Sequence, residues 1–103
     1  MQFLLTGRDG KDKDALDRRL AARPAHLERA EKMRQEGTLL MGAALLSPEG
    51  QMIGSIMVLN FPSADDVEKY LADEPYVIGN VWQEIVVQDI AVAPHFMPNA
   101  AKA

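Results

Sequence analysis

Residues 38–61 read TLLMGAALLSPEGQMIGSIMVLNF, and this stretch decides the fold. Two apolar runs, Thr38–Ser47 and Met52–Phe61, flank the turn-forming segment Pro48-Glu49-Gly50-Gln51, which is typical of a β-hairpin. Apolar side chains occupy both faces of each predicted strand. In the first strand, strict alternation places four residues on one face: Leu39, Met41, Ala43 and Leu45.

A sheet with one face in water alternates apolar and polar residues, and this hairpin does not. Both faces of the sheet therefore need a cover. Helices of the same chain can cover one face. The simplest cover for the other is the same face of a second copy, so the sequence predicts a homodimer packed sheet to sheet.

The residues before the hairpin predict one strand and two helical segments. Gln2–Gly7 is a strand that ends at the turn-forming pair Asp9-Gly10. Pro24 interrupts the helical pattern, so we expect a short helix over 13–21 and a new or kinked helix over 24–36, ended by Gly37. Four residues recur at helical spacing and form the predicted buried face: Leu16, Leu20, Leu27 and Ala30.

The residues after the hairpin predict a helix and a last strand. Ser63 is a good N-cap, and Asp66 three residues later resembles a capping box. The helix runs to about residue 72, buries Val67, Tyr70 and Leu71, and ends before Pro75; Val81–Val92 is the final strand. The order β-α-β-β-α-β predicts one ferredoxin-like α+β domain over 1–93, with an antiparallel sheet, helices on one face and a tail over 94–103.

Composition excludes several functional classes. The chain has 103 residues, a net charge of −4, no cysteine and two histidines, His26 and His95. Disulfides, thiolate metal sites and a thiol nucleophile are therefore excluded, and we expect no metal and no cofactor. The negative charge argues against a nucleic-acid partner. Because the N-terminus lacks a basic signal region and no apolar run is long enough for a bilayer, we expect a cytoplasmic protein with no membrane partner.

His26 is the main catalytic candidate. It falls in the first turn of the predicted helix that starts near Pro24, where the positive helix end favours a neutral imidazole that can act as a general base. Asp73 and Glu74 are the carboxylates that could orient it. The structural alternative is a histidine at the rim of the apolar face that only bonds to backbone.

Four further residues are candidates for substrate binding. Arg19 and Arg23 precede His26 in the helical region, and either could turn inward to hold an anionic substrate. The structural alternative is that these charges belong to a solvated helix face. Ser55 follows Gly54 inside a strand and could line a pocket. Tyr76 is a candidate for the core or a pocket wall.

Several segments resemble YciI-like (YCII-related) proteins. Arg23-Pro24-Ala25-His26-Leu27 resembles the family's Arg-x-x-His-Leu signature, and Glu74-Pro75-Tyr76-Val77 resembles its Asp-Pro-Tyr-Val segment. The resemblance covers roughly residues 2–90. It implies a dimeric α/β barrel with a His–carboxylate pair in a pocket of each protomer; the histidine falls on His26 and the aspartate on Glu74, with Asp73 adjacent.

Two function classes follow from these residues. The first is an enzyme with lyase- or isomerase-type chemistry on a small, cyclic or aromatic, anionic substrate. In it His26 is the general acid/base, Glu74 or Asp73 orients the ring, and an arginine offsets the substrate charge. The alternative is a non-catalytic dimeric module that binds a ligand or serves as an accessory.

Overall fold

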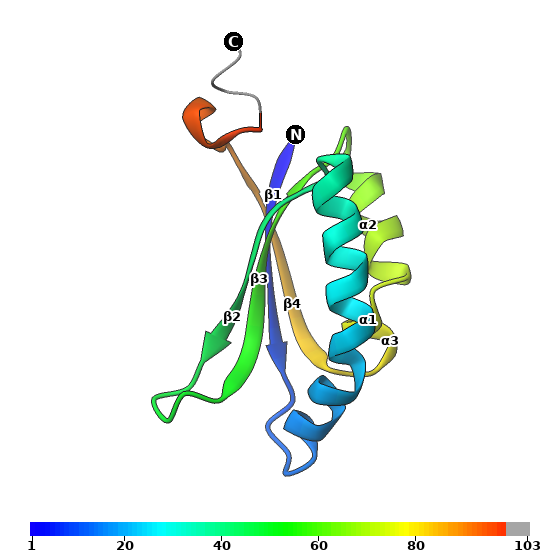
Figure 1. Ribbon diagram of the computed structural model, residues 1–103, viewed down its shortest axis with the longest axis vertical. Helices are drawn as coiled ribbons and strands as arrows, with labels where there is room; N and C mark the ends of the chain where they lie inside the picture. The colour runs from blue at the N-terminus through cyan, green and yellow to red at the C-terminus, as the bar shows by residue number, and fades with distance from the viewer. Residues whose placement is uncertain (99–103) are drawn as a thin grey trace.

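The computed structural model describes residues 1–98 as a four-stranded antiparallel sheet with the α-helices on one face (Figure 1). The strand order is β2-β3-β1-β4. This confirms the predicted ferredoxin-like α+β fold, with two additional short helices, α3 and η1. The elements are β1 (Gln2–Asp9), α1 (Ala15–Glu36), β2 (Leu39–Leu46), β3 (Met52–Asn60), α2 (Ala64–Ala72), α3 (Pro75–Ile78), β4 (Trp82–Ile90) and the 3₁₀ helix η1 (Pro94–Phe96).

The central strand β1 fixes which residues face the helices. Phe3 pairs with Leu59 and Leu5 pairs with Met57, and all four are buried under the helix layer. β1 continues past its predicted end at Gly7, so Asp9 lies in the strand and not in a turn. Since side chains alternate along a strand, Asp9 points to the same face as Phe3 and Leu5 and is also buried.

A β-bulge in β2 changes the predicted grouping of its side chains. Leu39 pairs with the buried Leu59, whereas Met41 pairs with Val58 on the opposite face. The prediction that Leu39 and Met41 share a face is therefore wrong, because strict alternation fails where the register shifts.

The sheet face away from the helices is apolar over β2 and β3, as predicted, while β1 and β4 also place Thr6, Arg8, Glu84 and Gln88 there. Pairing across the sheet places seven apolar residues on this open face: Leu4, Met41, Ala43, Leu45, Ile56, Val58 and Val86. Met41 and Val86 are 46% and 54% exposed. Nothing in the described part of the chain covers this face (Figure 1).

α1 is one continuous helix, so the predicted break at Pro24 is wrong. Proline lacks the N–H that would bond the carbonyl of Leu20. Both Pro24 and Leu20 are exposed, and water can therefore bond that carbonyl. The helix ends as predicted at Gly37, whose φ of 82° is left-handed and whose N–H bonds to the carbonyl of Arg34.

The buried face of α1 also differs from the prediction. Leu20 and Leu27 are 48% and 46% exposed, while Ala15, Arg19, His26 and Met33 are buried. Burying an arginine and a histidine is costly unless each finds polar partners. These partners come from β1, β3 and the segment after α2, which apolar periodicity within α1 cannot reveal.

The chain between α2 and β4 positions the acidic residue of the site. Ser63 precedes α2 as predicted, but its hydroxyl lies 3.1 Å from Asp66 Oδ2 and makes no side-chain bond to the helix backbone. The helix before Pro75 ends as predicted, and Pro75 itself is the first residue of the short helix α3. Glu74 is the N-cap of α3, and its Oε1 accepts the backbone N–H of Tyr76 at 3.2 Å.

Candidate functional site

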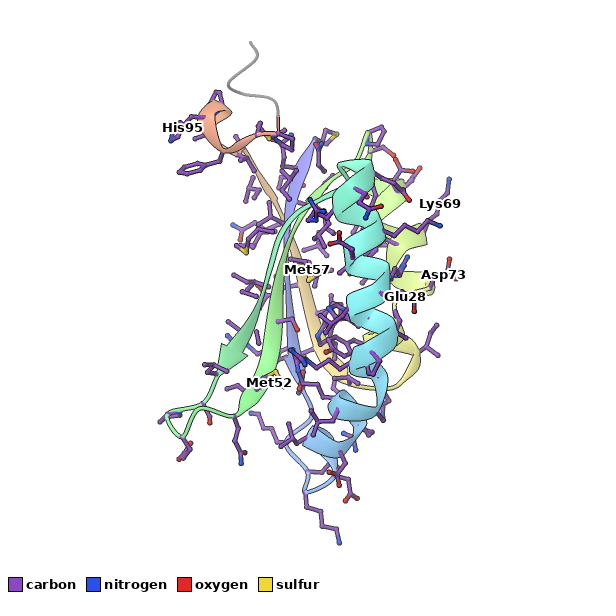
Figure 2. All side chains as sticks on the ribbon, in the orientation of Figure 1. Glu28, Met52, Met57, Lys69, Asp73 and His95 are labelled. Carbon is purple, nitrogen blue, oxygen red and sulfur yellow. The ribbon has the colours of Figure 1, made fainter. Side chains whose placement is uncertain are left out.

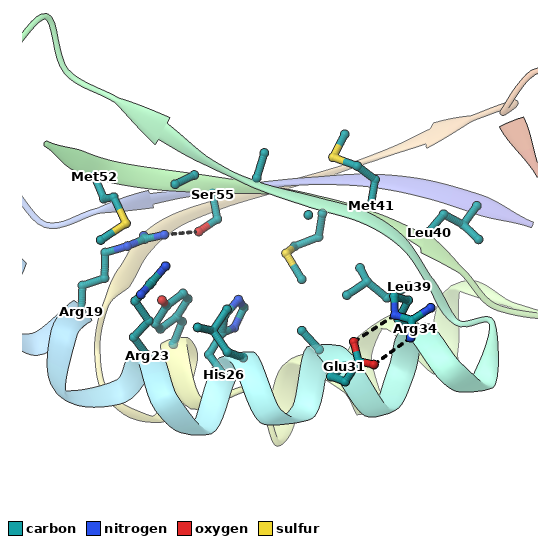
Figure 3. Close-up of a pocket in the computed structure, with 17 residues that line it drawn as sticks. Arg19, Arg23, His26, Glu31, Arg34, Leu39, Leu40, Met41, Met52 and Ser55 are labelled. Carbon is teal, nitrogen blue, oxygen red and sulfur yellow. Dashed lines mark hydrogen bonds and ion pairs between the residues drawn. The ribbon is translucent and has the colours of Figure 1, made fainter. Parts of the chain in front are cut away.

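One cavity of about 370 Å³ lies between α1 and the β2–β3 half of the sheet. Figure 3 shows Arg19, Arg23 and His26 projecting from α1 toward β3, the strand that carries Met52 and Ser55. Tyr76 of α3 also lines the cavity, and Met57 lies between the sheet and α1 (Figure 2). Five of the seven predicted site residues thus line this cavity: Arg19, Arg23, His26, Ser55 and Tyr76.

His26 and Glu74 form a buried pair at the cavity. His26 Nδ1 lies 2.6 Å from Glu74 Oε1, and the two residues are 7% and 1% exposed. Burial raises the pKa of Glu74, but the hydrogen bond and the charge of His26 oppose this effect and leave the pKa below its usual value. Glu74 is therefore a carboxylate, which only accepts hydrogen bonds, so Nδ1 carries the proton and donates it.

This arrangement leaves Nε2 of His26 available for chemistry. No described residue forms a hydrogen bond with Nε2. His26 lies in the middle of α1, so the predicted influence of a helix N-terminus is wrong; the carboxylate of Glu74 at Nδ1, and not a helix end, sets the tautomer of the ring. Asp73 is exposed and points away from the cavity (Figure 2), so the structure brings Glu74 and not Asp73 to the histidine.

Two aromatic rings hold the imidazole in place. Tyr76 stacks on His26 with ring centroids 3.9 Å apart and an interplanar angle of 13°. Trp82 meets His26 edge-on, with centroids 5.9 Å apart. These contacts and the bond to Glu74 restrict both the tilt and the rotation of the ring.

A second buried pair lies beside the first. Arg19 Nη1 is 3.0 Å from Asp9 Oδ1, Arg19 Nη2 is 2.9 Å from Ser55 Oγ, and the guanidinium carbon of Arg19 lies 4.7 Å from the centroid of the Tyr76 ring. Arg19 and Asp9 are 3% and 8% exposed. The charge of Arg19 is therefore offset within the protein, whereas Arg23 is exposed and makes no ion pair within residues 1–98.

Sequence reasoning missed three residues of this site. Asp9 was hidden by its assignment to a turn, although it continues the alternation of Phe3 and Leu5. Arg29 lies three residues after His26 on α1, and its Nη1 is 3.4 Å from Glu74 Oε2. Trp82 was not among the predicted site residues, and its Nε1 donates to Ser55 Oγ at 3.2 Å.

Two further features of the described residues concern metal ligands and helix length. Residues 1–98 contain no group of three or more His, Asp and Glu side chains placed to hold a metal ion. None of the helices in that range combines the length and apolar character needed to cross a bilayer.

The fold and the cavity define a ferredoxin-like α+β domain with a buried histidine–glutamate pair. The chain belongs to the YCII-related domain family, whose model matches residues 1–91. It is 28% identical over 81 residues to Protein YciI of Escherichia coli O6:H1. The matched region covers 73% of this chain and 83% of that protein.

Solved structures show the same fold. 5-Chloro-2-hydroxyhydroquinone dehydrochlorinase from Burkholderia phenoliruptrix AC1100, in complex with 2,5-dihydroxybenzoquinone, matches with a TM-score of 0.80 and 21% identity, covering 92% of this chain and 98% of that chain. A dimeric ferredoxin-like protein of unknown function from Jannaschia sp. CCS1 matches with a TM-score of 0.51 and 15% identity, covering 88% and 98%.

Proposed function

We propose that this protein is a small-molecule enzyme in which His26 is the general acid/base and Glu74 orients it. The observation that carries this proposal is the 2.6 Å contact between His26 Nδ1 and Glu74 Oε1 at the wall of a cavity. A carboxylate on Nδ1 fixes the tautomer and stabilises the imidazolium that forms when Nε2 takes a proton. Proton transfer is thus the chemistry that the site supports best.

The proposed reaction is of the lyase or isomerase type. His26 Nε2 removes a proton from the substrate. In an isomerisation the same proton returns to a different atom; in an elimination a leaving group departs with its bonding electrons from the neighbouring atom, and the proton is released afterwards. The matching dehydrochlorinase supports the elimination class, because dehydrochlorination is the loss of a proton and a chloride. The apolar and aromatic cavity wall suits a cyclic or aromatic substrate.

Charge at the cavity favours an anionic substrate. Asp9 offsets the charge of Arg19, so that residue contributes geometry more than net charge. Arg23 lines the same cavity, is exposed and has no ion pair within the described range, so it is the cation available to a bound carboxylate or phenolate. Ser55 and Tyr76 complete the proposed binding surface.

We further propose that the enzyme is a homodimer that packs through the open faces of its two sheets. The apolar residues of that face, the family membership and the dimeric state of the Jannaschia protein support this assembly. A cytoplasmic location and the lack of a nucleic-acid partner or cofactor stay predictions from the sequence.

A ligand screen followed by a turnover assay tests the proposed function. Thermal-shift measurements with small hydroxylated aromatic acids, hydroquinones and quinones should find ligands that stabilise the wild type. His26→Ala should lower that stabilisation and abolish turnover, while the control His95→Ala, which changes an exposed histidine, should alter neither. Ligands that bind equally well to both variants would contradict the role of His26, and binding with no turnover would favour the non-catalytic module.

A further inference from the structure

Ser55 occupies an unusual position in the cavity wall. It is only 2% exposed, and its side chain faces the helix layer because Ser55 pairs with Gly7 in line with the buried residues of β1. Its Oγ has two close nitrogen neighbours: Arg19 Nη2 at 2.9 Å and Trp82 Nε1 at 3.2 Å. Figure 3 shows the bond from Arg19 reaching across the cavity to Ser55.

Both neighbours can only donate. A guanidinium and an indole N–H have no acceptor atom, whereas a hydroxyl has two lone pairs and one proton. Arg19 and Trp82 together use both lone pairs of Ser55 Oγ, which leaves its proton for a third partner. No described residue accepts that proton. Because Ser55 lines the cavity, a molecule bound there can supply this third partner.

We propose that Ser55 is an oxyanion-binding residue, with its hydroxyl held as a hydrogen-bond donor toward a carbonyl or phenolic oxygen of the substrate. This inference rests on the proposed function and extends it to the substrate class. It requires a compound whose oxygen gains negative charge as a proton leaves, which is an enolisable cyclic ketone or a phenol.

The surroundings strengthen Ser55 as a donor. A hydroxyl that accepts from a cation is polarised and donates more strongly, and its burial lowers the local screening. Asp9 fixes Arg19, so the guanidinium stays on Ser55. Trp82 is bonded to Ser55 and is edge-on to His26, so one side chain sets the position of the oxyanion donor relative to the base. Arg19 and Trp82 are therefore positioning residues.

4-Nitrophenol is a suitable probe, because its ionised form absorbs visible light and mimics a substrate oxyanion. The pKa of the bound probe would be measured by titration with wild type, Ser55→Ala, Trp82→Phe and the control Ser47→Ala. Ser47 lies in the β2–β3 turn and does not line the cavity. Nitrobenzene serves as a neutral probe of the same size. Circular dichroism checks that each variant is folded.

We expect wild type and Ser47→Ala to lower the pKa of the bound phenol relative to the free phenol. Ser55→Ala should weaken phenolate binding about tenfold, which raises the bound pKa by about one unit. Trp82→Phe should raise the pKa of the bound phenol by less, because the Ser55 hydroxyl stays and only its hydrogen bond from Trp82 Nε1 is lost. Nitrobenzene affinity should change by less than about threefold in both variants, since it needs no such donor.

The outcomes separate this inference from the proposed function. An unchanged bound pKa in Ser55→Ala, with the probe still bound, overturns the role of Ser55 and leaves His26 and Glu74 as the catalytic pair. If Ser55→Ala does not fold, an unchanged bound pKa in Trp82→Phe overturns it instead. Failure of wild type to bind both probes overturns the inference and the proposed function together.

Discussion

At the residue scale, two buried hydrogen-bonded pairs lie side by side. Glu74 holds His26, Asp9 holds Arg19, and the ring of Tyr76 lies between the imidazole and the guanidinium. Removing charges from water is costly, and an apolar replacement of similar volume is often equally stable. We therefore infer that these pairs are retained because they fix the geometry of the cavity.

The first prediction concerns the pH dependence of Glu74. Its folded pKa lies below the ordinary value of 4.5, so the folded state binds the proton less tightly than the unfolded state. The resulting stability is present above pH 4.5 and is lost as the pH falls below it. Glu74→Gln should lower the free energy of unfolding at neutral pH by about 1–3 kcal/mol and flatten its fall in acid.

Urea unfolding at neutral pH and near pH 3.5 measures both effects. The control is Glu28→Gln, which changes an exposed glutamate on α1, the helix that carries His26 (Figure 2). Its unfolding free energy should match that of wild type at both pH values. A Glu74→Gln protein that keeps the steep acid loss of wild type would contradict the assignment of that loss to Glu74.

At the element scale, α1 combines a proline in its interior with a polar buried stripe. Arg19 and His26 are buried against the sheet, while Leu20 and Leu27 are 48% and 46% exposed, Leu27 at the rim of the cavity. The helix is thus held by specific polar contacts as well as by apolar burial. In such a helix, a substitution on the exposed side should alter stability without moving the site.

Pro24→Ala tests this separation. Alanine restores the N–H that can bond the Leu20 carbonyl and has a far better helix propensity, so the free energy of unfolding should rise by about 1–3 kcal/mol. Ligand binding in the cavity should not change. Ala25→Gly is the matched control at the next exposed position and should lose about 1 kcal/mol. A weaker ligand affinity in Pro24→Ala would show that the proline helps to place His26.

The same helix shows how far the sequence could predict the structure. Strand and helix order followed from local apolar periodicity and turn residues such as Gly37. The buried face of α1 did not, because His26 is stabilised inside by Glu74, 48 residues away, and Arg19 by Asp9 and Ser55. Periodicity scores apolar residues only, so a polar stripe paired with distant partners looks like solvent-exposed surface.

At the scale of the whole molecule, the sheet has one covered face and one open face. The helices cover Phe3, Leu5 and Leu59, while Val86 and its apolar neighbours on the open face stay partly exposed. A contiguous apolar sheet face is a common interface in symmetric dimers, because the same patch on two copies is self-complementary. The cavity lies on the helix side, so each protomer of the proposed dimer would hold its own His26–Glu74 pair.

Val86→Lys tests the proposed dimer. Val86 is 54% exposed at the open face, and a lysine there would meet its symmetry-related copy or be buried without a partner in a sheet-to-sheet dimer. Light scattering coupled to size-exclusion chromatography should give twice the chain mass for wild type and a shift toward the monomer mass for the variant. Ile78→Lys is the matched control, because Ile78 is 70% exposed on α3, away from the sheet. A Val86→Lys dimer as stable as wild type, or an Ile78→Lys monomer, would place the interface elsewhere.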